Sequence, residues 1–301
     1  MEKTRDIVSK TAILNPTAVS SFFKLMKPRV MSLVIFTGFA GMYLAPGELH
    51  PILAVISLLA IAAGAGASGA INQWYDRDID AVMQRTCTRP IPSGEVEPSE
   101  ALAFGIIVSF ISVLILCLSA NFLAGGLLAF TIIFYGLIYT IWLKRSTPQN
   151  IVIGGAAGAL PPIIGWASVT SSVSMDSIIL FGLIFFWTPP HFWALALVKN
   201  EDYTKAKIPM LPVVVGGDET RRQIFIYSII MVGVSLLPSV IGTSKILYSS
   251  VAGIIGLIFL TLAFQLLKQP DDKLAMRLFK YSIAYLFILF FALICDKAIL
   301  G

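Results

Sequence analysis

The hydrophobic residues of this chain gather into long, nearly continuous runs that short polar stretches separate. A helix needs roughly 17 to 25 mostly apolar residues to cross a bilayer, and nine runs reach that length. The pattern therefore predicts an all-α polytopic membrane protein, a bundle of nine transmembrane helices. Their approximate limits are 29–46, 52–72, 101–119, 121–143, 150–169, 175–198, 223–243, 246–267 and 278–297.

Two of these runs contain paired prolines, Pro161-Pro162 in the fifth and Pro189-Pro190 in the sixth. Proline removes a helical hydrogen bond and its ring clashes with the preceding turn. Irregular backbone at membrane depth is tolerated where it lines a cavity or is buried in protein. We therefore expect both spans to be broken at these pairs.

The basic residues are distributed asymmetrically about the nine runs. Of the 22 Lys and Arg residues, all except Lys245 and Lys297 fall before or at the start of the first run, or in the loops after the even-numbered runs. By the positive-inside rule, the N-terminus and these loops are cytoplasmic. We expect a cytoplasmic N-terminal segment over 1–28. Residues 29–301 should form a single intramembrane domain, because no linker is long enough to separate two cores.

Composition narrows the classes of function. Of the 301 residues, 57% are hydrophobic and 13% are charged, whereas soluble domains carry about 25% charged residues. The net charge of +5 comes from the short loops and does not indicate nucleic-acid binding. The three cysteines, which form no C-x-x-C pair, indicate neither a disulfide framework nor a zinc site.

The stretch that follows the second run carries the candidate chemistry. Asn72, Asp76 and Asp80 are spaced four residues apart, so in a helix they share one face. Two carboxylates and an amide oxygen repel one another unless a cation or water lies between them, and hard oxygen ligands suit Mg²⁺. Arg85 and Arg89 follow, and arginine matches phosphate oxygens in shape and charge. The stretch predicts a magnesium and diphosphate site at the membrane edge, and the alternative is a solvated polar loop.

Further candidates lie on the same predicted side. Lys199 and Tyr203 are one helical turn apart after the sixth run, and Lys205 adds positive charge. Lys144 ends the fourth run, where the alternative is an anchor at the bilayer interface.

His191 lies inside the sixth run, and a histidine within a membrane span is a functional candidate. Its alternative role is a hydrogen bond to a carbonyl that Pro190 frees.

The pattern Asn72-x-x-x-Asp76-x-x-x-Asp80, with Arg85 and Arg89 after it, closely resembles the first aspartate-rich motif of the UbiA-type intramembrane prenyltransferases. Most of that superfamily has a second Asp-x-x-x-Asp motif, whose positions here are Lys199 and Tyr203. Several strings resemble the protoheme IX farnesyltransferase branch of the superfamily. They are Lys27-Pro-Arg29, Arg85-Thr-x-x-Arg89-Pro-x-Pro-Ser-Gly94, Tyr139-Thr-x-x-Leu-Lys-Arg145, Thr147-Pro-Gln-Asn150, Thr188-Pro-Pro-His-Phe-Trp193, and Asp202-Tyr203 leading to Ile208-Pro-Met-Leu-Pro212.

The resemblance implies transfer of a farnesyl group from farnesyl diphosphate to a vinyl group of heme B. Water addition then gives heme O and diphosphate. Heme is a substrate here rather than a cofactor. His191 is the candidate heme contact. The implied metal is Mg²⁺, held by Asn72, Asp76 and Asp80, and the implied diphosphate ligands are Arg85, Arg89, Lys144, Lys199 and Lys205.

The same resemblance implies a place in the cell and partners. The protein would lie in a bacterial cytoplasmic (inner) membrane with its active site facing the cytoplasm. The lipid bilayer and a downstream heme A synthase would be its partners. Two other functions remain open at this point. One is prenylation of an aromatic acid such as 4-hydroxybenzoate, and the other is secondary transport with proline-broken helices as the gate.

Overall fold

The computed structural model describes residues 16–300, and over that range it is built from helices without a strand. The first fifteen residues of the predicted N-terminal segment lie outside the described residues. The helices are α1 (Pro16–Leu25), α2 (Pro28–Leu44), α3 (Pro51–Tyr75), α4 (Arg77–Val82), α5 (Pro98–Ser119), α6 (Phe122–Ile133), the π-helix η1 (Phe134–Leu143), α7 (Lys144–Ser146), α8 (Asn150–Ala159), α9 (Pro161–Thr170), α10 (Met175–Val198), α11 (Asn200–Lys205), α12 (Leu211–Val240), α13 (Ile246–Lys268) and α14 (Asp272–Leu300).

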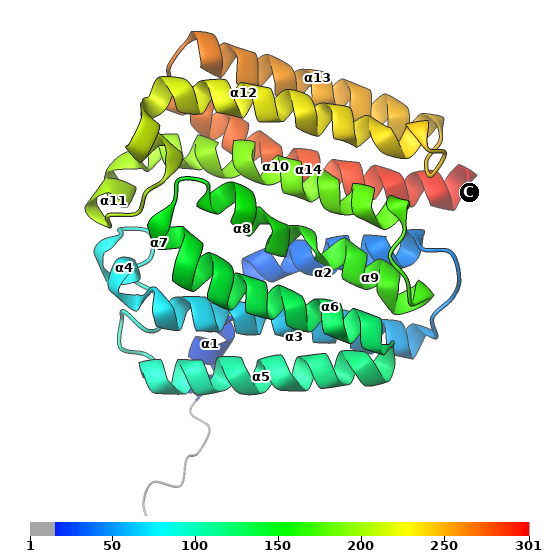
Figure 1. The fold of residues 1–301 in the computed structure, drawn as a ribbon, viewed down its shortest axis with the longest axis horizontal. Helices are drawn as coiled ribbons and strands as arrows, with labels where there is room; N and C mark the ends of the chain where they lie inside the picture. Colours follow the sequence, from blue (N-terminus) through cyan, green and yellow to red (C-terminus); the bar gives the residue numbers. More distant parts are fainter. Residues whose placement is uncertain (1–15, 301) are drawn as a thin grey trace, which may run out of the picture.

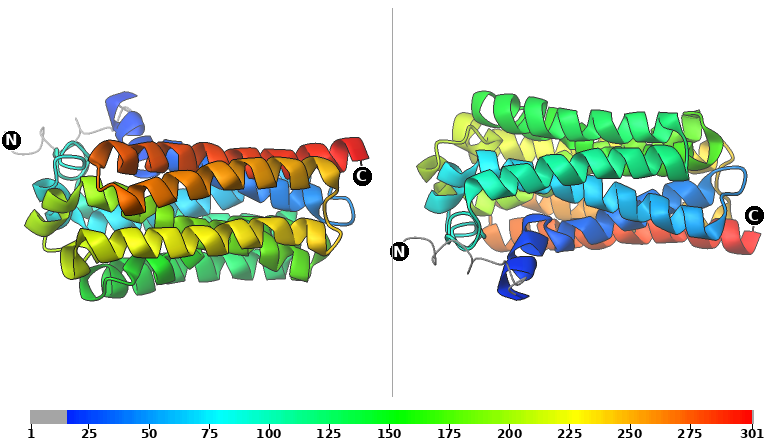
Figure 2. Two further views of the ribbon diagram at one scale, coloured as in Figure 1. Left: turned by 90° about the horizontal axis from the view of Figure 1, so that it is seen from above. Right: turned by 90° about the horizontal axis from the view of Figure 1, so that it is seen from below.

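The nine predicted spans correspond to nine helical units of the described chain. Eight are long and apolar enough to cross a membrane, and α2 is a shorter apolar helix. The units lie side by side, and successive units run in opposite directions (Figure 1). The short elements α4, α7 and α11 lie at one end, and the C-terminus lies at the other (Figures 1 and 2).

One expected break is present and the other is not. The fifth span divides at Leu160 into α8 and α9, and Pro161 takes the first position of α9, where its missing N–H costs nothing. The sixth span is a single helix, α10, with Pro189 and Pro190 in its interior. That expectation was wrong: both prolines are buried inside the bundle, where a helix tolerates an interior proline.

The limits of two spans also differ from those expected. Helix α12 begins at Leu211, twelve residues before the predicted span, and Gly216 interrupts it with a positive φ of 85°. Helix α14 begins at Asp272 rather than at 278. In both cases the added turns carry polar and charged side chains that hydropathy assigns to a loop, and their backbone is helical except at Gly216.

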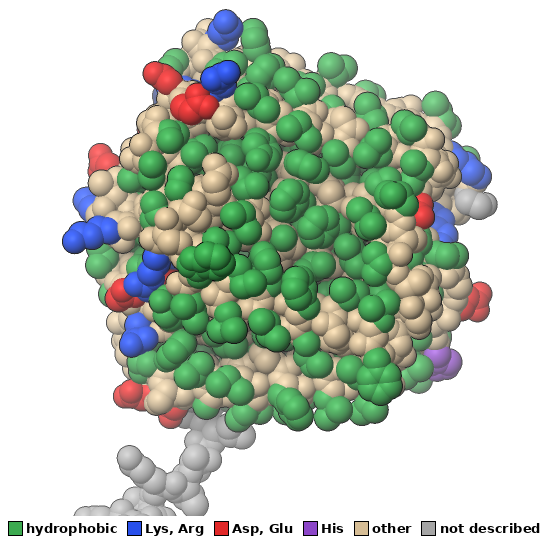
Figure 3. Space-filling view, viewed as in Figure 1, with side chains coloured by type: hydrophobic (Ala, Val, Ile, Leu, Met, Phe, Trp, Pro, Cys, Tyr) green, Lys and Arg blue, Asp and Glu red, His purple; other side chains and the backbone are tan. Residues whose placement is uncertain are grey.

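The surface follows the charge pattern of the sequence. Hydrophobic side chains cover the middle of the face in Figure 3, and Lys, Arg, Asp and Glu lie toward the two ends of the bundle.

Lys297, at the end with few basic residues, has a local role. Its Nζ donates hydrogen bonds to the carbonyls of Tyr43 (2.8 Å), Leu44 (3.2 Å) and Ala45 (3.2 Å), where the negative end of the α2 dipole favours a cation.

Helices α2 and α9 cross at glycines. A Cβ atom added to Gly165 would lie 2.0 Å from the carbonyl oxygen of Gly38, and one added to Gly41 would lie 2.1 Å from that of Pro162. The two backbones therefore touch at these positions, as small residues allow in membrane bundles. This contact fixes α2 against the rest of the bundle.

We predict that Gly165→Ala destabilises the protein by about 1–3 kcal/mol, because the new methyl group overpacks a backbone contact. The measurement is thermal unfolding in detergent. Gly126→Ala is the matched control, since a Cβ atom there meets nothing within 4 Å and alanine favours a helix by about 0.5–1 kcal/mol. Equal behaviour of the two variants would contradict the close crossing.

Candidate active site

Asn72, Asp76 and Asp80 lie on successive turns where α3 passes into α4. The amide of Asp76 donates to the carbonyl of Asn72 (2.9 Å) and that of Asp80 to the carbonyl of Asp76 (2.8 Å), so helical bonding runs through the junction. All three side chains are buried. Asp78 points elsewhere, as its spacing predicts: its side chain is 62% exposed.

Cations from three other parts of the chain surround these oxygens. Lys27 Nζ donates to Asn72 Oδ1 (2.7 Å), and Lys144 forms an ion pair with Asp76. Arg89 Nη1 contacts both carboxylate oxygens of Asp80, at 2.9 and 2.7 Å. The cluster therefore contains more positive than negative charge, which suits an anionic ligand.

Lys27 takes a backbone conformation that is uncommon for a residue with a side chain. It is the N-cap of α2 and has φ 54°, in the left-handed region. This turn between α1 and α2 directs its amine at Asn72. Burial, with the nearby charges of Arg89 and Lys144, lowers the pKa of Lys27 to about 7.

The donor set fits a magnesium ion that shares its coordination with a substrate. Asp76 Oδ1 is buried without a hydrogen-bond partner, and Arg145 Nη2 lies 3.6 Å from it. Among the described residues, no three His, Cys, Asp or Glu side chains group as a metal centre. A metal here would take Asp76, Asp80 and Asn72, with water and phosphate oxygens as the remaining ligands, as Mg²⁺ prefers.

A π-helix supplies the wall beside the cluster. Asn72 Nδ2 donates to Asp76 Oδ2 (2.6 Å) and to the hydroxyl of Thr140 on η1 (3.2 Å), which fixes the amide orientation so that its oxygen faces Lys27. Tyr135 and Tyr139 of the same element line a cavity next to the cluster. π-Helical turns often occur at functional sites, and this one presents a hydroxyl and two phenols to one site.

The polar residues after the sixth span form two groups in the structure. Tyr203 is buried, and its phenol lies within hydrogen-bonding reach of Arg85, with Arg89 nearby. Burial raises the pKa of this phenol, so it stays protonated at neutral pH. Lys199 and Lys205 instead line a separate pocket of about 350 Å³ with Gln84. The structure thus brings Tyr203, but not these two lysines, to the arginines.

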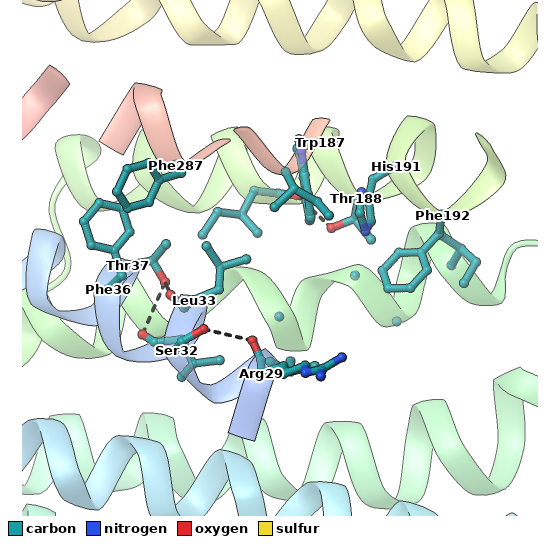
Figure 4. A pocket seen from close by; sticks show the side chains of 18 of the residues that line it. Arg29, Ser32, Leu33, Phe36, Thr37, Trp187, Thr188, His191, Phe192 and Phe287 are labelled. Atoms are coloured by element: carbon teal, nitrogen blue, oxygen red, sulfur yellow. Dashed lines mark hydrogen bonds between the residues drawn. The ribbon is translucent and has the colours of Figure 1, made fainter. Parts of the chain in front are cut away.

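An apolar cavity of about 900 Å³ lies beside the cluster, and Tyr135 and Tyr139, which are near Asp76, are among the residues that line it. It is enclosed by α2, η1, α8, α10 and α14. Figure 4 shows Arg29, His191 and Phe192 toward one end, and Phe36, Thr37 and Phe287 toward the other. Gly154, Gly155 and Gly158 of α8 also line it, and a Cβ atom on Gly158 would meet nothing within 4 Å. The volume suits a large apolar ligand.

His191 lines this cavity and is held by side chains. Its Nδ1 lies 2.6 Å from the Ser282 hydroxyl, and its ring stacks between Trp187 and Phe279 at centroid distances of 4.2 and 4.6 Å. The partner of Nδ1 is thus a hydroxyl on α14, and not a carbonyl that Pro190 frees. The ring is oriented toward the cavity without a charged neighbour in direct contact.

Three members of the site did not emerge from helical spacing, namely Lys27, Thr140 and Tyr135. Lys27 and Thr140 lie 45 and 68 residues from Asn72, which they both contact. The only signal for the first two was their presence in the strings Lys27-Pro-Arg29 and Tyr139-Thr140. Tyr135 gave none, because an aromatic residue in an apolar run resembles any lipid-facing one.

The fold and the site define a membrane-embedded prenyltransferase. Residues 34–294 match the UbiA prenyltransferase family, and the chain belongs to that family. Its relatives at high identity carry the name protoheme IX farnesyltransferase. One from Rhizobium johnstonii is 54% identical over 97% of this chain and 93% of its own length. Another, from Rickettsia bellii, is 57% identical over 92% and 93%.

Solved structures share the fold. A digeranylgeranylglyceryl phosphate synthase has a TM-score of 0.78 at 19% identity, over 93% of this chain and 98% of its own. A UbiA homologue from Archaeoglobus fulgidus, described as bound to GPP and Mg²⁺, has a TM-score of 0.64 at 17% identity, over 91% and 99%. At these identities the likeness concerns the arrangement of helices.

We predict that Arg89→Met destabilises the protein by about 3 kcal/mol, because it leaves the Asp80 carboxylate buried without its partner. Adding Asp80→Asn should recover most of this loss, since the unpaired charge is then gone. Chemical unfolding in detergent measures both. Arg222→Met, which removes an exposed pair with Glu219 at 3.5 Å, is the control and should cost under about 1 kcal/mol. A double variant no more stable than Arg89→Met would contradict the pairing.

Proposed function

We propose that this protein transfers the farnesyl group of farnesyl diphosphate to a vinyl group of heme B, giving heme O and diphosphate. The observation that carries the proposal is the junction of a cation-rich carboxylate cluster with a large apolar cavity. The first suits a diphosphate, and the second suits an isoprenoid tail and a porphyrin. The names of relatives above 50% identity over nearly the whole chain support the same reaction.

The cluster would activate the leaving group. Asn72, Asp76 and Asp80 would hold Mg²⁺, which when bound neutralises charge on the departing diphosphate. Lys144 and Arg89 now pair with the two carboxylates. With a metal on the carboxylates, these cations are free to bind phosphate oxygens. Arg85, positioned by Tyr203, adds a further donor where negative charge develops.

The reaction then needs no nucleophile from the protein. The bond between C1 of the farnesyl group and the diphosphate oxygen breaks, leaving an allylic cation. The terminal carbon of the heme vinyl group attacks C1, and the positive charge moves to the vinyl carbon next to the ring. Water adds there and loses a proton, which gives the hydroxyethylfarnesyl side chain. The apolar walls limit access of other water to the allylic cation.

His191 is proposed to contact the heme. Its ring lines the cavity, and its Nδ1 is already bonded to the Ser282 hydroxyl, so Nε2 is the nitrogen available to a substrate. The stacked Trp187 and Phe279 fix the orientation of the ring. A preorganised nitrogen in an apolar wall suits either the iron or a porphyrin edge.

Two other functions were open from the sequence. Prenylation of an aromatic acid would use the same diphosphate site. The cavity, however, is much larger than a single benzene ring requires, and the names of the relatives favour heme as the acceptor. Transport would need an ionisable pathway through the bilayer. The buried carboxylates are instead Asp80 in α4 and Asp76 directly before it, and α4 lies at one end of the bundle (Figure 1).

The distribution of Lys and Arg supports an orientation in a bacterial inner membrane with this end of the bundle in the cytoplasm. There the soluble head of farnesyl diphosphate reaches the cluster directly, while its tail enters the cavity from the bilayer. A downstream heme A synthase, which would receive the product, stays a prediction.

We predict that Asp76→Ala abolishes heme O formation while the protein still inserts in the membrane, because it removes the carboxylate shared by the metal and Lys144. Loss of charge stabilisation of this kind costs about 3–4 kcal/mol of barrier, or 10²–10³ in rate. Mass spectrometry of extracted hemes measures it. The matched control is Asp78→Asn, two residues away and exposed, which should retain activity within about threefold. Normal turnover by Asp76→Ala would refute the site assignment.

We predict that Tyr203→Phe raises the KM for farnesyl diphosphate by about tenfold, because Arg85 loses the polar neighbour that positions it. Lys199→Gln and Lys205→Gln should change this KM by less than about threefold, since both lysines line a separate pocket. Steady-state assays at saturating heme compare the three. A larger effect of the lysine variants would place the diphosphate nearer to α11.

A further inference from the structure

Two cations stand at one end of the apolar cavity. Arg29, on the first turn of α2, and Lys280, on α14, both line the cavity and are both exposed. Within residues 16–300 neither takes part in an ion pair, and none of the side chains that line the cavity is acidic. This end therefore selects a ligand with an apolar body and negative groups at its edge.

Lys280 lies on a helix that is separated from the π-helix around the cavity, and Arg29 lies at the start of the neighbouring helix α2. Around the cavity, α8 packs against η1, α10 against α8, α14 against α10, and α2 against α14. Lys280 therefore belongs to a wall that α8 and α10 separate from η1 around the cavity. Tyr135 and Tyr139 mark the opposite wall, next to the carboxylate cluster. The cavity thus has a basic side and a side that adjoins the diphosphate site.

We propose that Arg29 and Lys280 bind the two propionate groups of the heme substrate. The inference rests on the proposed function and adds the orientation of the acceptor. Both propionates of heme B occupy one edge of the ring, and its vinyl groups lie on the other half of the macrocycle. Propionates at Arg29 and Lys280 direct the vinyl-bearing half toward Tyr135 and Tyr139. A vinyl carbon is then on the side where C1 of the farnesyl group is released.

The diphosphate is a less suitable partner for this pair. The cluster at Asp76 and Asp80 already has Lys27, Arg89 and Lys144 in direct contact. Lys280 lies on the opposite wall. A dicarboxylate that spans α2 and α14 uses both cations at once, whereas the diphosphate beside α3 reaches at most the nearer one.

The experiment compares heme B with its dimethyl ester as acceptors for the full-length protein in detergent, with Mg²⁺ and farnesyl diphosphate. The ester keeps the ring, the iron and the vinyl groups but removes both negative charges. One exposed ion pair strengthens binding by at most about fivefold. Two such pairs together should make wild type prefer heme over the ester by about 25-fold in kcat/KM. Arg29→Gln with Lys280→Gln should turn over both acceptors at nearly the same rate. Each single variant should lose about fivefold on heme only.

Arg277→Gln is the matched control, because Arg277 lies on the same helix one turn from Lys280 and does not line the cavity. It should keep the full preference for heme. Titration of heme absorbance measures binding of the two porphyrins separately from turnover. The double variant should bind the ester as wild type does, which also shows that it is folded. If it fails to fold, the ester comparison in wild type and the two single variants decide the question.

Several results would overturn the assignment. Wild type that uses heme and its ester equally well has no propionate contact of this kind. A double variant that keeps the preference places the propionates elsewhere, and a raised KM for farnesyl diphosphate would assign these cations to the diphosphate. Wild type that farnesylates neither porphyrin refutes the proposed function instead. In that case, if heme still binds about 25-fold more tightly than its ester, the binding data support the contact of Arg29 and Lys280 with the propionates.

Discussion

The contact on which the site depends is the pairing of two buried carboxylates with cations from distant parts of the chain. Asp76 and Asp80 are almost completely buried at the edge of an apolar bundle, and burial of an unpaired charge there costs several kcal/mol. Lys144 and Arg89 offset that cost, and Lys27 satisfies the adjacent amide. The end of the fourth span, the loop after α4 and the start of α2 are thereby held against the junction of α3 and α4.

The same pairing prepares the protein for its ligand. In the described structure each carboxylate carries the cation that the mechanism assigns to a phosphate. In the proposed mechanism, binding of a metal and a diphosphate together would exchange one set of ion pairs for another, so the charges would stay paired in both states. A metal alone would leave Lys144 and Arg89 without partners, and a diphosphate alone would lie against uncompensated carboxylates. The arrangement favours joint binding of the two.

Sequence alone predicted the parts of this protein that depend on local periodicity. The nine spans follow from apolar length, and the face of Asn72, Asp76 and Asp80 follows from helical spacing. What could not be predicted is set by packing between helices. Pro189 and Pro190 do not break α10, because burial by neighbours outweighs the local preference. The contacts of Lys27 and Thr140 with Asn72 join positions far apart in the chain, and no local pattern encodes them.

The candidate site shows the same division. The polar stretch after the sixth span resembles a single cationic motif in sequence and contains Lys199, Tyr203 and Lys205. In the structure the tyrosine lies near Arg85, whereas the two lysines line another pocket. Charge counts in a loop therefore indicate which side faces the cytoplasm but not which cations meet a ligand. The cavity provides the sharper criterion. A cation that lines it and has no acidic partner within residues 16–300, such as Arg29 or Lys280, is available to an anionic substrate, whereas a cation paired at the surface is not.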